Sequence, residues 1–359
     1  MQPFIYESLP HRVLFGAGRS SEVRGEVERL GAVHALVLST PQQTDLARQV
    51  ADLLGDLCAG IHDQAVMHVP VTTVAAALER VRALQVDCLV APGGGSTIGL
   101  AKGIALETGL PIVAIPTTYA GSEMTPIWGL TRDGIKTTGK DPVVKPKSVI
   151  YDPALLLTLP PGFSATSGMN AMAHAVEALY AENANPITSL MAEESIRALA
   201  EGLPKVVQNP ADLEARSETL YGSWLAATVL ASVGMALHHK LCHTLGGSFD
   251  LPHAEVHTVI LPYATAYNAS HAKTAMQALG RALNVEPADA GGAIFDLNQA
   301  LSAPTALKTL NFSRDQVDEA TRIATQNPYF NPRPVTAEGI KSLLTQAFDG
   351  IRPEPVEFV

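Results

Sequence analysis

The chain has 359 residues, of which 47% are hydrophobic and 17% are charged, and its formal net charge is −10 at pH 7. The length predicts about two domains with a large buried core, and the composition excludes a disordered polyelectrolyte, a collagen and a coiled coil. A net negative chain has no broad basic field. We therefore expect no nucleic-acid partner, and any anionic ligand must be bound by local groups.

The cysteines and the N-terminus predict a cytoplasmic protein. Cys58, Cys88 and Cys242 show no metal-binding spacing, which is typical of reduced thiols in the cytosol. Residues 1–7 contain no basic segment followed by an apolar stretch, so we expect no signal peptide. The uncharged stretch 219–237 is interrupted by Gly, Ser and Thr. It therefore predicts a buried helix rather than a membrane span.

The first half of the chain alternates between short apolar runs and amphipathic segments. Runs rich in Val, Leu and Ile predict strands over residues 12–15, 34–39, 87–91 and 111–116. Apolar spacing of three and four predicts helices over residues 20–30, 44–54 and 71–84. This alternation predicts an α/β, Rossmann-like domain whose mostly parallel sheet has helices on both faces. Asp133-Gly134, at the centre of residues 128–138, predicts a β-hairpin.

After about residue 152 the strand patterns largely vanish, and segments rich in Ala and Leu follow. Helical spacing predicts helices over residues 167–180, 186–203, 213–244, 257–267, 272–283, 288–301, 314–324 and 336–348. Turn clusters of Gly, Asn and Pro separate these segments. We therefore predict a dinucleotide-binding α/β domain over residues 1–158 and an all-helical catalytic domain over residues 159–359.

A glycine-rich turn follows the predicted strand 87–91 and precedes a helical run over residues 98–107. Glycine lets the backbone turn sharply and lets a ligand approach closely. The unpaired N–H groups and the dipole of a helix start favour a phosphate. The spacing matches neither the usual dinucleotide fingerprint nor a P-loop, and a plain helix-capping turn is the alternative. We predict that this turn binds a phosphate or pyrophosphate through Gly93, Gly94, Gly95, Ser96 and Thr97. We expect Ser96 and Thr97 to cap the helix and to donate their hydroxyls to the ligand.

A second polar turn, residues 116–123, follows the next predicted strand. The carboxyl ends of neighbouring parallel strands meet at one edge of a sheet, where ligands of open α/β sheets bind. We therefore expect Thr117, Thr118 and Ser122 to lie at the same ligand site, although the Thr-Thr turn alone is also typical of a helix cap.

Four residues advance a helix by about 400°, so residues at this spacing share a face. Asn170 and His174 form one such pair, and His239 and His243 form another. Gly246-Gly247 predicts the end of the second helix, which places His253 in a loop. A histidine pair at this spacing, with a third histidine from a loop, could hold a divalent metal. Asn170 is neutral, however, and a metal-free histidine cluster is the favoured interpretation.

Together these residues resemble the iron-containing (group III) alcohol dehydrogenase family over nearly the whole chain. In that family a Gly-Gly-Gly-Ser turn binds the dinucleotide pyrophosphate, and an Asp-x-x-x-His pair with two later histidines binds the metal. Here Asn170 stands at the Asp position. His174, His239 and His253 stand at the histidine positions, and His243 matches a further active-site histidine.

Residues 115–123, 168–179, 252–257 and 331–334 are similar to the maleylacetate reductases, a subgroup of that family to which the Asp-to-Asn change belongs. The resemblance implies reduction of maleylacetate and substituted maleylacetates to 3-oxoadipate with NADH or NADPH, during the breakdown of aromatic compounds. It also implies a homodimer and no metal. Thr40 follows the strand over residues 34–39, at a position where an acidic residue would repel a 2′-phosphate. We therefore expect Thr40 to contact the cofactor, and both NADH and NADPH to serve.

The implied reaction adds hydride and a proton to an activated C=C bond, through an enolate that hydrogen-bond donors must stabilise. Histidine suits this role because its pKa lies near neutrality. We predict that His243, with His174, His239 or His253, supplies the oxyanion contact and the proton. Candidate substrate-binding residues are Lys136, Lys140, Arg333 and Asn170, whose neutral amide does not repel a dianion.

Three other functions stay open at this level. A metal-dependent alcohol or polyol dehydrogenase of the same fold is the first, although Asn170 disfavours it. A non-redox lyase of the dehydroquinate-synthase type is the second, and a binding protein that has lost turnover is the third.

Overall fold

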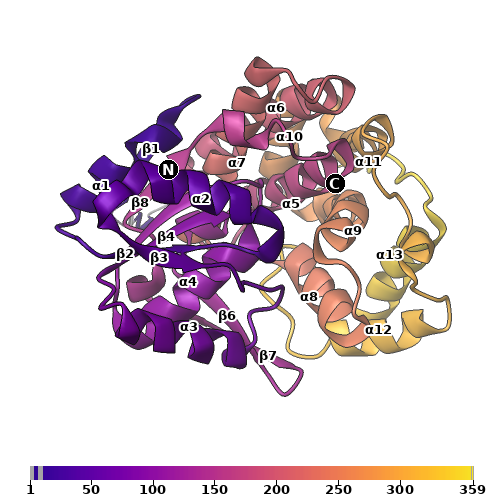
Figure 1. Cartoon of the computed structure of the whole chain (residues 1–359). Coiled ribbons are helices and arrows are strands. Elements are labelled where there is room, and N and C mark those ends of the chain that lie inside the picture. The colour runs from indigo at the N-terminus through magenta and orange to yellow at the C-terminus, as the bar shows by residue number, and fades with distance from the viewer. Residues whose placement is uncertain (1–3, 7–10, 357, 359) are drawn as a thin grey trace. The chain divides into compact units, whose positions relative to one another are not determined.

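The computed structural model describes residues 4–6, 11–356 and 358 (Figure 1). By its contacts the chain divides into two compact units, Leu9–Leu159 and Pro160–Val359, and the described residues 4–6 group with the second. The described residues 4–6 therefore fall in the helical unit, whereas the predicted division placed them in the first domain. Residues 1–3 and 7, on which part of the signal-peptide expectation rests, lie outside the described residues.

The first unit contains a six-stranded parallel sheet in the order β1-β8-β5-β4-β2-β3. The strands in chain order are β1 (Arg12–Phe15), β2 (Ala35–Leu38), β3 (Cys58–His62), β4 (Cys88–Gly93), β5 (Ile112–Pro116) and β8 (Ser148–Tyr151). The four predicted strands are present. Two further strands were not predicted: β3, a half-buried edge strand interrupted by Gly60, and β8, which has only four residues.

Helices cover both faces of this sheet, as predicted (Figure 1). They are α1 (Val23–Arg29), α2 (Thr44–Leu54), α3 (Val71–Ala83) and α4 (Gly95–Thr108). Alternate strand residues such as Val37, Val90 and Val113 pack with Val27 of α1 and Val50 of α2 in one core cluster. Because successive strand side chains point to opposite faces, the intervening residues face α3 and α4.

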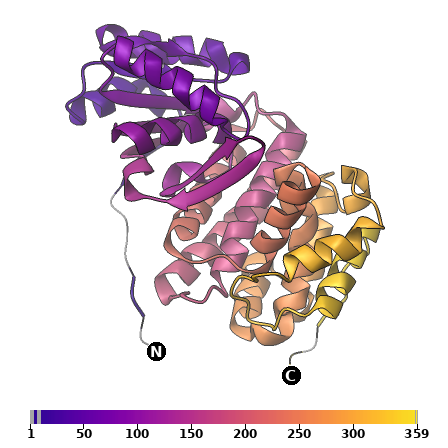
Figure 2. The same cartoon turned by 90° about the horizontal axis from the view of Figure 1, so that it is seen from below.

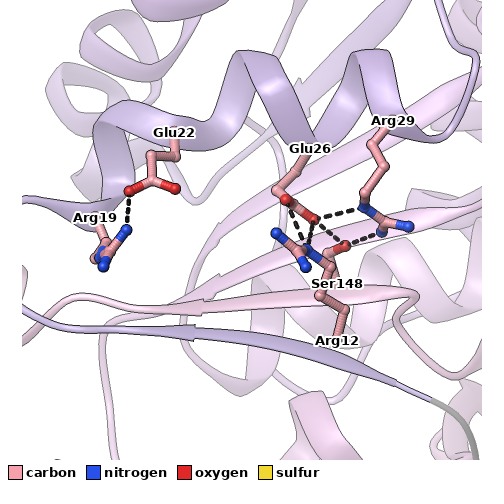
Figure 3. A network of polar contacts seen from close by, with 6 residues as sticks. All are labelled: Arg12, Arg19, Glu22, Glu26, Arg29 and Ser148. Carbon is pink, nitrogen blue, oxygen red and sulfur yellow. Dashed lines mark hydrogen bonds and ion pairs between the residues drawn. The ribbon is translucent and has the colours of Figure 1, made fainter.

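A buried carboxylate, Glu26, fixes α1 to the sheet (Figure 3). It accepts hydrogen bonds from Arg12 Nε of β1 at 2.9 Å and from Ser148 Oγ of β8 at 2.6 Å. Arg29 Nε donates a third at 3.1 Å. Burial raises the pKa of Glu26, but these hydrogen bonds outweigh it and the net pKa is lowered, so the carboxylate stays ionised. The network holds the edge of the sheet that is remote from the glycine-rich turn.

The predicted hairpin is confirmed, with strands β6 (Ile127–Arg132) and β7 (Ile135–Lys140). Asp133 and Gly134 have φ values of 50° and 76°. Positive φ at both central residues is what a two-residue hairpin turn requires.

The second unit is helical, and its described residues contain no strand (Figure 2). This agrees with the predicted fold class. Its helices are α5 (Pro161–Ala178), α6 (Pro186–Gln208), α7 (Leu213–Ser232), α8 (Leu237–Phe249), α9 (His253–Asn268), α10 (Lys273–Leu283), α11 (Ala290–Ala300), α12 (Gln316–Ala324) and α13 (Ala337–Asp349). A continuous apolar core joins α8, α9 and α13 through residues such as Leu241, Ile260 and Leu344.

Two predictions about this unit were wrong. The single helix expected over residues 213–244 is two helices, because the backbone is extended at Val233 and Ala236. The Gly246-Gly247 pair does not end α8, which continues to Phe249 and stops where Asp250 takes a left-handed conformation. His253 consequently begins α9 and does not lie in a loop.

Within the described part of the chain, no single helix is long and apolar enough to cross a membrane. The pair α7 and α8 passes the same test of length and composition only when the two helices are taken together, and a 95° bend separates them.

Candidate active site

The glycine-rich turn joins β4 to α4 in the first unit. A Cβ atom on Gly93 would lie 2.4 Å from Thr97 Oγ1, and one on Gly94 would lie 2.9 Å from Thr118 Cγ2. A Cβ atom on Gly95 would meet nothing within 4 Å. Gly93 and Gly94 are thus required by the packing of the turn itself. Gly95 faces open space, where only an approaching ligand would be obstructed.

The expectation that Ser96 and Thr97 cap α4 was wrong. Gly94 is the N-cap, and no side chain caps the helix. The Thr97 side chain is fully buried against Gly93, and its hydroxyl has no hydrogen-bond partner among the described residues. The first N–H groups of a helix have no intrahelical partner. An anion at this turn would therefore meet backbone N–H groups rather than the Thr97 hydroxyl.

The second polar turn lies against the first, as expected. The Thr117 N–H donates a hydrogen bond to Gly93 O at 3.3 Å, and the Thr118 methyl group packs against Gly94. Gln43, which follows Thr40 and the end of β2, donates from Nε2 to Thr117 Oγ1 at 3.0 Å. Gln43 therefore connects a third strand end to the same edge, and no signal in the sequence pointed to it.

A buried lysine of α4 fixes the remainder of this turn. Lys102 Nζ donates to Ser122 O at 2.6 Å, to Thr125 Oγ1 at 3.0 Å and to Ile127 O at 2.8 Å. Burial lowers the pKa of this amine to about 7. Lys102 was not among the predicted site residues, although it anchors the loop that carries Ser122.

In the second unit, α5 presents three polar side chains on one buried face: Asn170, His174 and Glu177. His174 Nδ1 lies 2.9 Å from His239 Nε2, and His239 Nδ1 lies 2.7 Å from Glu177 Oε2. Two of the four predicted catalytic histidines are therefore joined in a buried chain that ends on a carboxylate.

Glu177 also fixes the start of α8. Its two oxygens accept the backbone N–H groups of Ala236 at 2.8 Å and His238 at 2.6 Å. Burial raises the pKa of Glu177 to about 7 and lowers that of His239 to about 3, so His239 is neutral. The prediction missed Glu177, although its spacing of three from His174 placed it on the same helical face.

The other two predicted histidines are exposed. His243 Nδ1 lies 3.1 Å from the Tyr329 hydroxyl, and its ring centroid is 6.0 Å from that of His239. His253 is the first residue of α9, and its ring centroid lies 4.4 Å from that of His257. His257 in turn lies 4.9 Å from His239. All four histidines therefore belong to one continuous group of rings.

The four predicted substrate-binding residues are divided between the units. Lys136 and Lys140 are exposed on β7 of the first unit. Arg333 of the second unit stacks 4.2 Å from the centroid of the Tyr267 ring and donates from Nη1 to Tyr267 O at 3.0 Å. Asn170 is buried, and its Oδ1 has no hydrogen-bond partner within the described ranges. That oxygen can still accept a hydrogen bond.

The residues at the predicted metal positions include no carboxylate. Among the described residues, one group of three His, Cys or acidic side chains has ligand atoms that all lie within 4.8 Å of one another. That group does not consist of His174, His239 and His253. Asn170 contributes a neutral oxygen, so this set contains no anionic ligand. Divalent metals bound by histidine and oxygen are usually held with a carboxylate.

The two halves of the chain match models of one family. Residues 10–153 match the iron-containing alcohol dehydrogenase model, and residues 164–348 match the C-terminal model of the Fe-containing alcohol dehydrogenase family. The chain belongs to the iron-containing alcohol dehydrogenase family.

The maleylacetate reductase of Sphingobium indicum is 53% identical over 350 residues, which cover 98% of this chain and 99% of that protein. The crystal structure of maleylacetate reductase from Agrobacterium tumefaciens superposes with a TM-score of 0.96 at 51% identity and covers 98% of this chain and 100% of that one. A more distant neighbour is sulfoacetaldehyde reductase from Bifidobacterium kashiwanohense in complex with NAD+. It is 25% identical, has a TM-score of 0.89, and covers 97% of this chain and 99% of that one.

Proposed function

We propose that this protein is an oxidoreductase that reduces maleylacetate to 3-oxoadipate with NADH or NADPH. The observation that carries the proposal is the 53% identity, over almost the full length of both chains, to a maleylacetate reductase. The experiment is to follow NADH oxidation with maleylacetate, identify the product, and repeat the assay with simple alcohols, polyols and aldehydes. Turnover on those compounds, without turnover on maleylacetate, would instead support the alternative of an alcohol or polyol dehydrogenase.

The chemistry defines what the site must provide. The C=C bond of maleylacetate is conjugated with a ketone that the product retains. Hydride from the nicotinamide therefore adds to the carbon β to that ketone, and the electron pair of the alkene moves to the ketone oxygen. The resulting enolate is stabilised by hydrogen-bond donors and takes one proton at carbon. Overall, the alkene gains H⁻ from the cofactor and H⁺ from an acid.

The first unit binds the cofactor in this proposal. The backbone N–H groups of Gly95, Ser96 and Thr97 at the start of α4 meet the pyrophosphate, because the helix dipole and unpaired donors favour an anion there. Thr117, Thr118 and Ser122 line the neighbouring turn.

Thr40 follows the end of β2, at a position where a carboxylate would exclude a 2′-phosphate. Because Thr40 carries no carboxylate, it does not exclude that phosphate. We therefore expect both NADH and NADPH to be used. A preference for either of about a thousandfold or more in kcat/KM would contradict this part of the proposal.

His243 and His253 are the proposed donors to the enolate and its proton source. They are exposed, whereas the ring nitrogen of His239 that could reach a substrate is occupied by its contact with His174. His174 and His239 then act as a support that is held by Glu177. This assigns different roles to four histidines that the sequence could not distinguish.

The substrate's two carboxylates require cations, and we assign Lys136, Lys140 and Arg333 to them, with the Asn170 amide accepting or donating a hydrogen bond. We propose that no metal takes part, because the residues at the family's metal positions lack a carboxylate. A cytoplasmic homodimer that acts in the breakdown of aromatic compounds is part of the same proposal.

A further inference from the structure

Beside the proposed catalytic histidines lies a second, fully buried group made of His238, Cys242 and His257. His238 and Cys242 are four residues apart on α8 and share a face, and His257 comes from the first turns of α9. His238 Nε2 lies 2.9 Å from His257 Nδ1 and 3.5 Å from Cys242 Sγ. One ligand atom from each of the three residues lies within 4.8 Å of the other two.

The protons of the two imidazole rings are not fixed by other contacts. His238 Nδ1 and His257 Nε2 are buried and have no hydrogen-bond partner within the described residues. Each ring is therefore free to take the tautomer that leaves a lone pair facing the group. Neutral imidazole, with one nitrogen protonated and the other carrying a lone pair, is the form that ligates metals.

We propose that His238, Cys242 and His257 form a site for a soft monovalent metal ion, Cu⁺. Thiolate is a soft donor that selects Cu⁺, and imidazole also binds copper. On binding, the Cys242 S–H bond breaks, an S–Cu bond forms and one proton is released, while copper stays in the +1 state. The single thiolate then neutralises a single positive charge. A divalent ion would leave a net charge in a fully buried site, which is costly.

An exposed ring lies next to this buried group. The ring of His253 lies 4.4 Å, between centroids, from the buried ring of His257. This site differs from the family's metal positions in all three residues, so it does not depend on Asn170.

The test is an anaerobic titration of the metal-free full-length protein with Cu⁺, in competition with a chromogenic Cu⁺ chelator. We expect one equivalent to bind, with release of one proton and with an affinity at least about a hundredfold higher than that of the Cys242→Ala variant. The matched controls, Cys58→Ala and Cys88→Ala, remove the other two cysteines and should bind as the wild type does. The same affinity in Cys242→Ala as in the wild type would overturn the proposal.

X-ray absorption on the copper-loaded wild type keeps the test valid if Cys242→Ala fails to fold. We expect one sulfur and two imidazole nitrogens around copper. A first shell without sulfur would place the ion on His174, His239 or His253 and overturn the proposal, as would tighter binding of Zn²⁺ than of Cu⁺. Because binding is measured without substrate or NADH, the result is independent of the proposed reductase activity.

Discussion

His239 Nδ1 lies 2.7 Å from Glu177 Oε2, and both side chains are almost entirely excluded from solvent. The same carboxylate accepts two backbone N–H groups at the start of α8. One residue of α5 thus sets the position of the helix that carries His238, Cys242 and His243, and sets the orientation of the His239 ring. The proposed catalytic group in the second unit depends on this contact.

Glu177→Gln should destabilise the helical unit. The amide cannot accept all three hydrogen bonds, and one buried donor is left without a partner, at a cost of about 1–3 kcal/mol. Urea unfolding followed through Trp224, which lies on α7 in this unit, measures the loss. Glu194→Gln, at a partly exposed carboxylate on α6, is the matched control and should change stability far less.

The effect of Glu177→Gln should also depend on pH. The pKa of Glu177 is raised by burial to about 7 in the folded state, above its usual 4.5. The folded state therefore holds this proton more tightly, so the group's contribution to stability is fully present below pH 4.5 and is lost as the pH rises to 7. The slope of unfolding free energy against pH should consequently differ between wild type and variant in this window. Parallel curves would contradict the assigned pKa.

Acidification should destabilise the same unit through its buried histidines. Burial lowers the pKa of His239 to about 3, and His238 and His257 shift in the same direction. Their contribution is present above pH 6.5 and is lost as the pH falls, with a slope of up to about 1.4 kcal/mol per pH unit for each group. His238→Gln should reduce this slope. His271→Gln, which changes an exposed ring on the same unit, should not.

His243→Asn and His253→Asn should each lower kcat by about 10²–10⁴-fold, the range that a proton donor contributes. Both side chains are exposed, so the melting temperature should change little. The measurement is steady-state NADH oxidation with maleylacetate, with thermal unfolding as the check on folding. Near-wild-type kcat in both variants would remove these histidines from the mechanism.

Two glycine substitutions separate packing from ligand approach at the cofactor turn. Gly94→Ala places a methyl group 2.9 Å from Thr118 Cγ2 and should lower the melting temperature. Gly95→Ala places its methyl group in open space. It should leave the melting temperature unchanged yet raise the KM for NADH by about tenfold or more, because it obstructs the approach of the pyrophosphate. An unchanged KM in Gly95→Ala would mean that the cofactor does not use this turn.

The strand–helix alternation predicted the fold well. The spacing of apolar residues indicates whether a segment is a strand or a helix, and the alternating order of the two along the chain indicates an α/β sheet. The edge strand β3 is interrupted by Gly60, and the interior strand β8 has only four residues, so neither gave a clear periodic pattern. The break between α7 and α8 escaped for another reason: the backbone N–H groups freed at Ala236 and His238 bond to Glu177, a tertiary partner that local sequence cannot reveal.

The candidate site was predictable to the level of residue type. The i, i+4 spacing predicted His239 and His243, and the same spacing one residue earlier holds His238 and Cys242, which were not predicted. The exposure that separates His243 and His253 from His174 and His239 depends on how α5, α8 and α9 pack, and spacing along one helix does not encode it.

The donor set at the family's metal positions can be altered directly. Asn170→Asp restores a carboxylate beside His174 and should raise the affinity for Zn²⁺ or Fe²⁺ by at least about tenfold, measured by calorimetry. Turnover with maleylacetate should fall, because an added anion repels a dianionic substrate. Asn170→Ala removes the same amide without adding charge and should gain no metal affinity.

The central claim is a reduction of maleylacetate by histidine donors without a metal. Its most direct test is the rate of NADH oxidation with maleylacetate before and after exhaustive treatment with EDTA. The account predicts rapid turnover that EDTA leaves unchanged and that added Zn²⁺ or Fe²⁺ does not increase. Loss of turnover with EDTA, and its recovery on addition of a divalent metal, would contradict it.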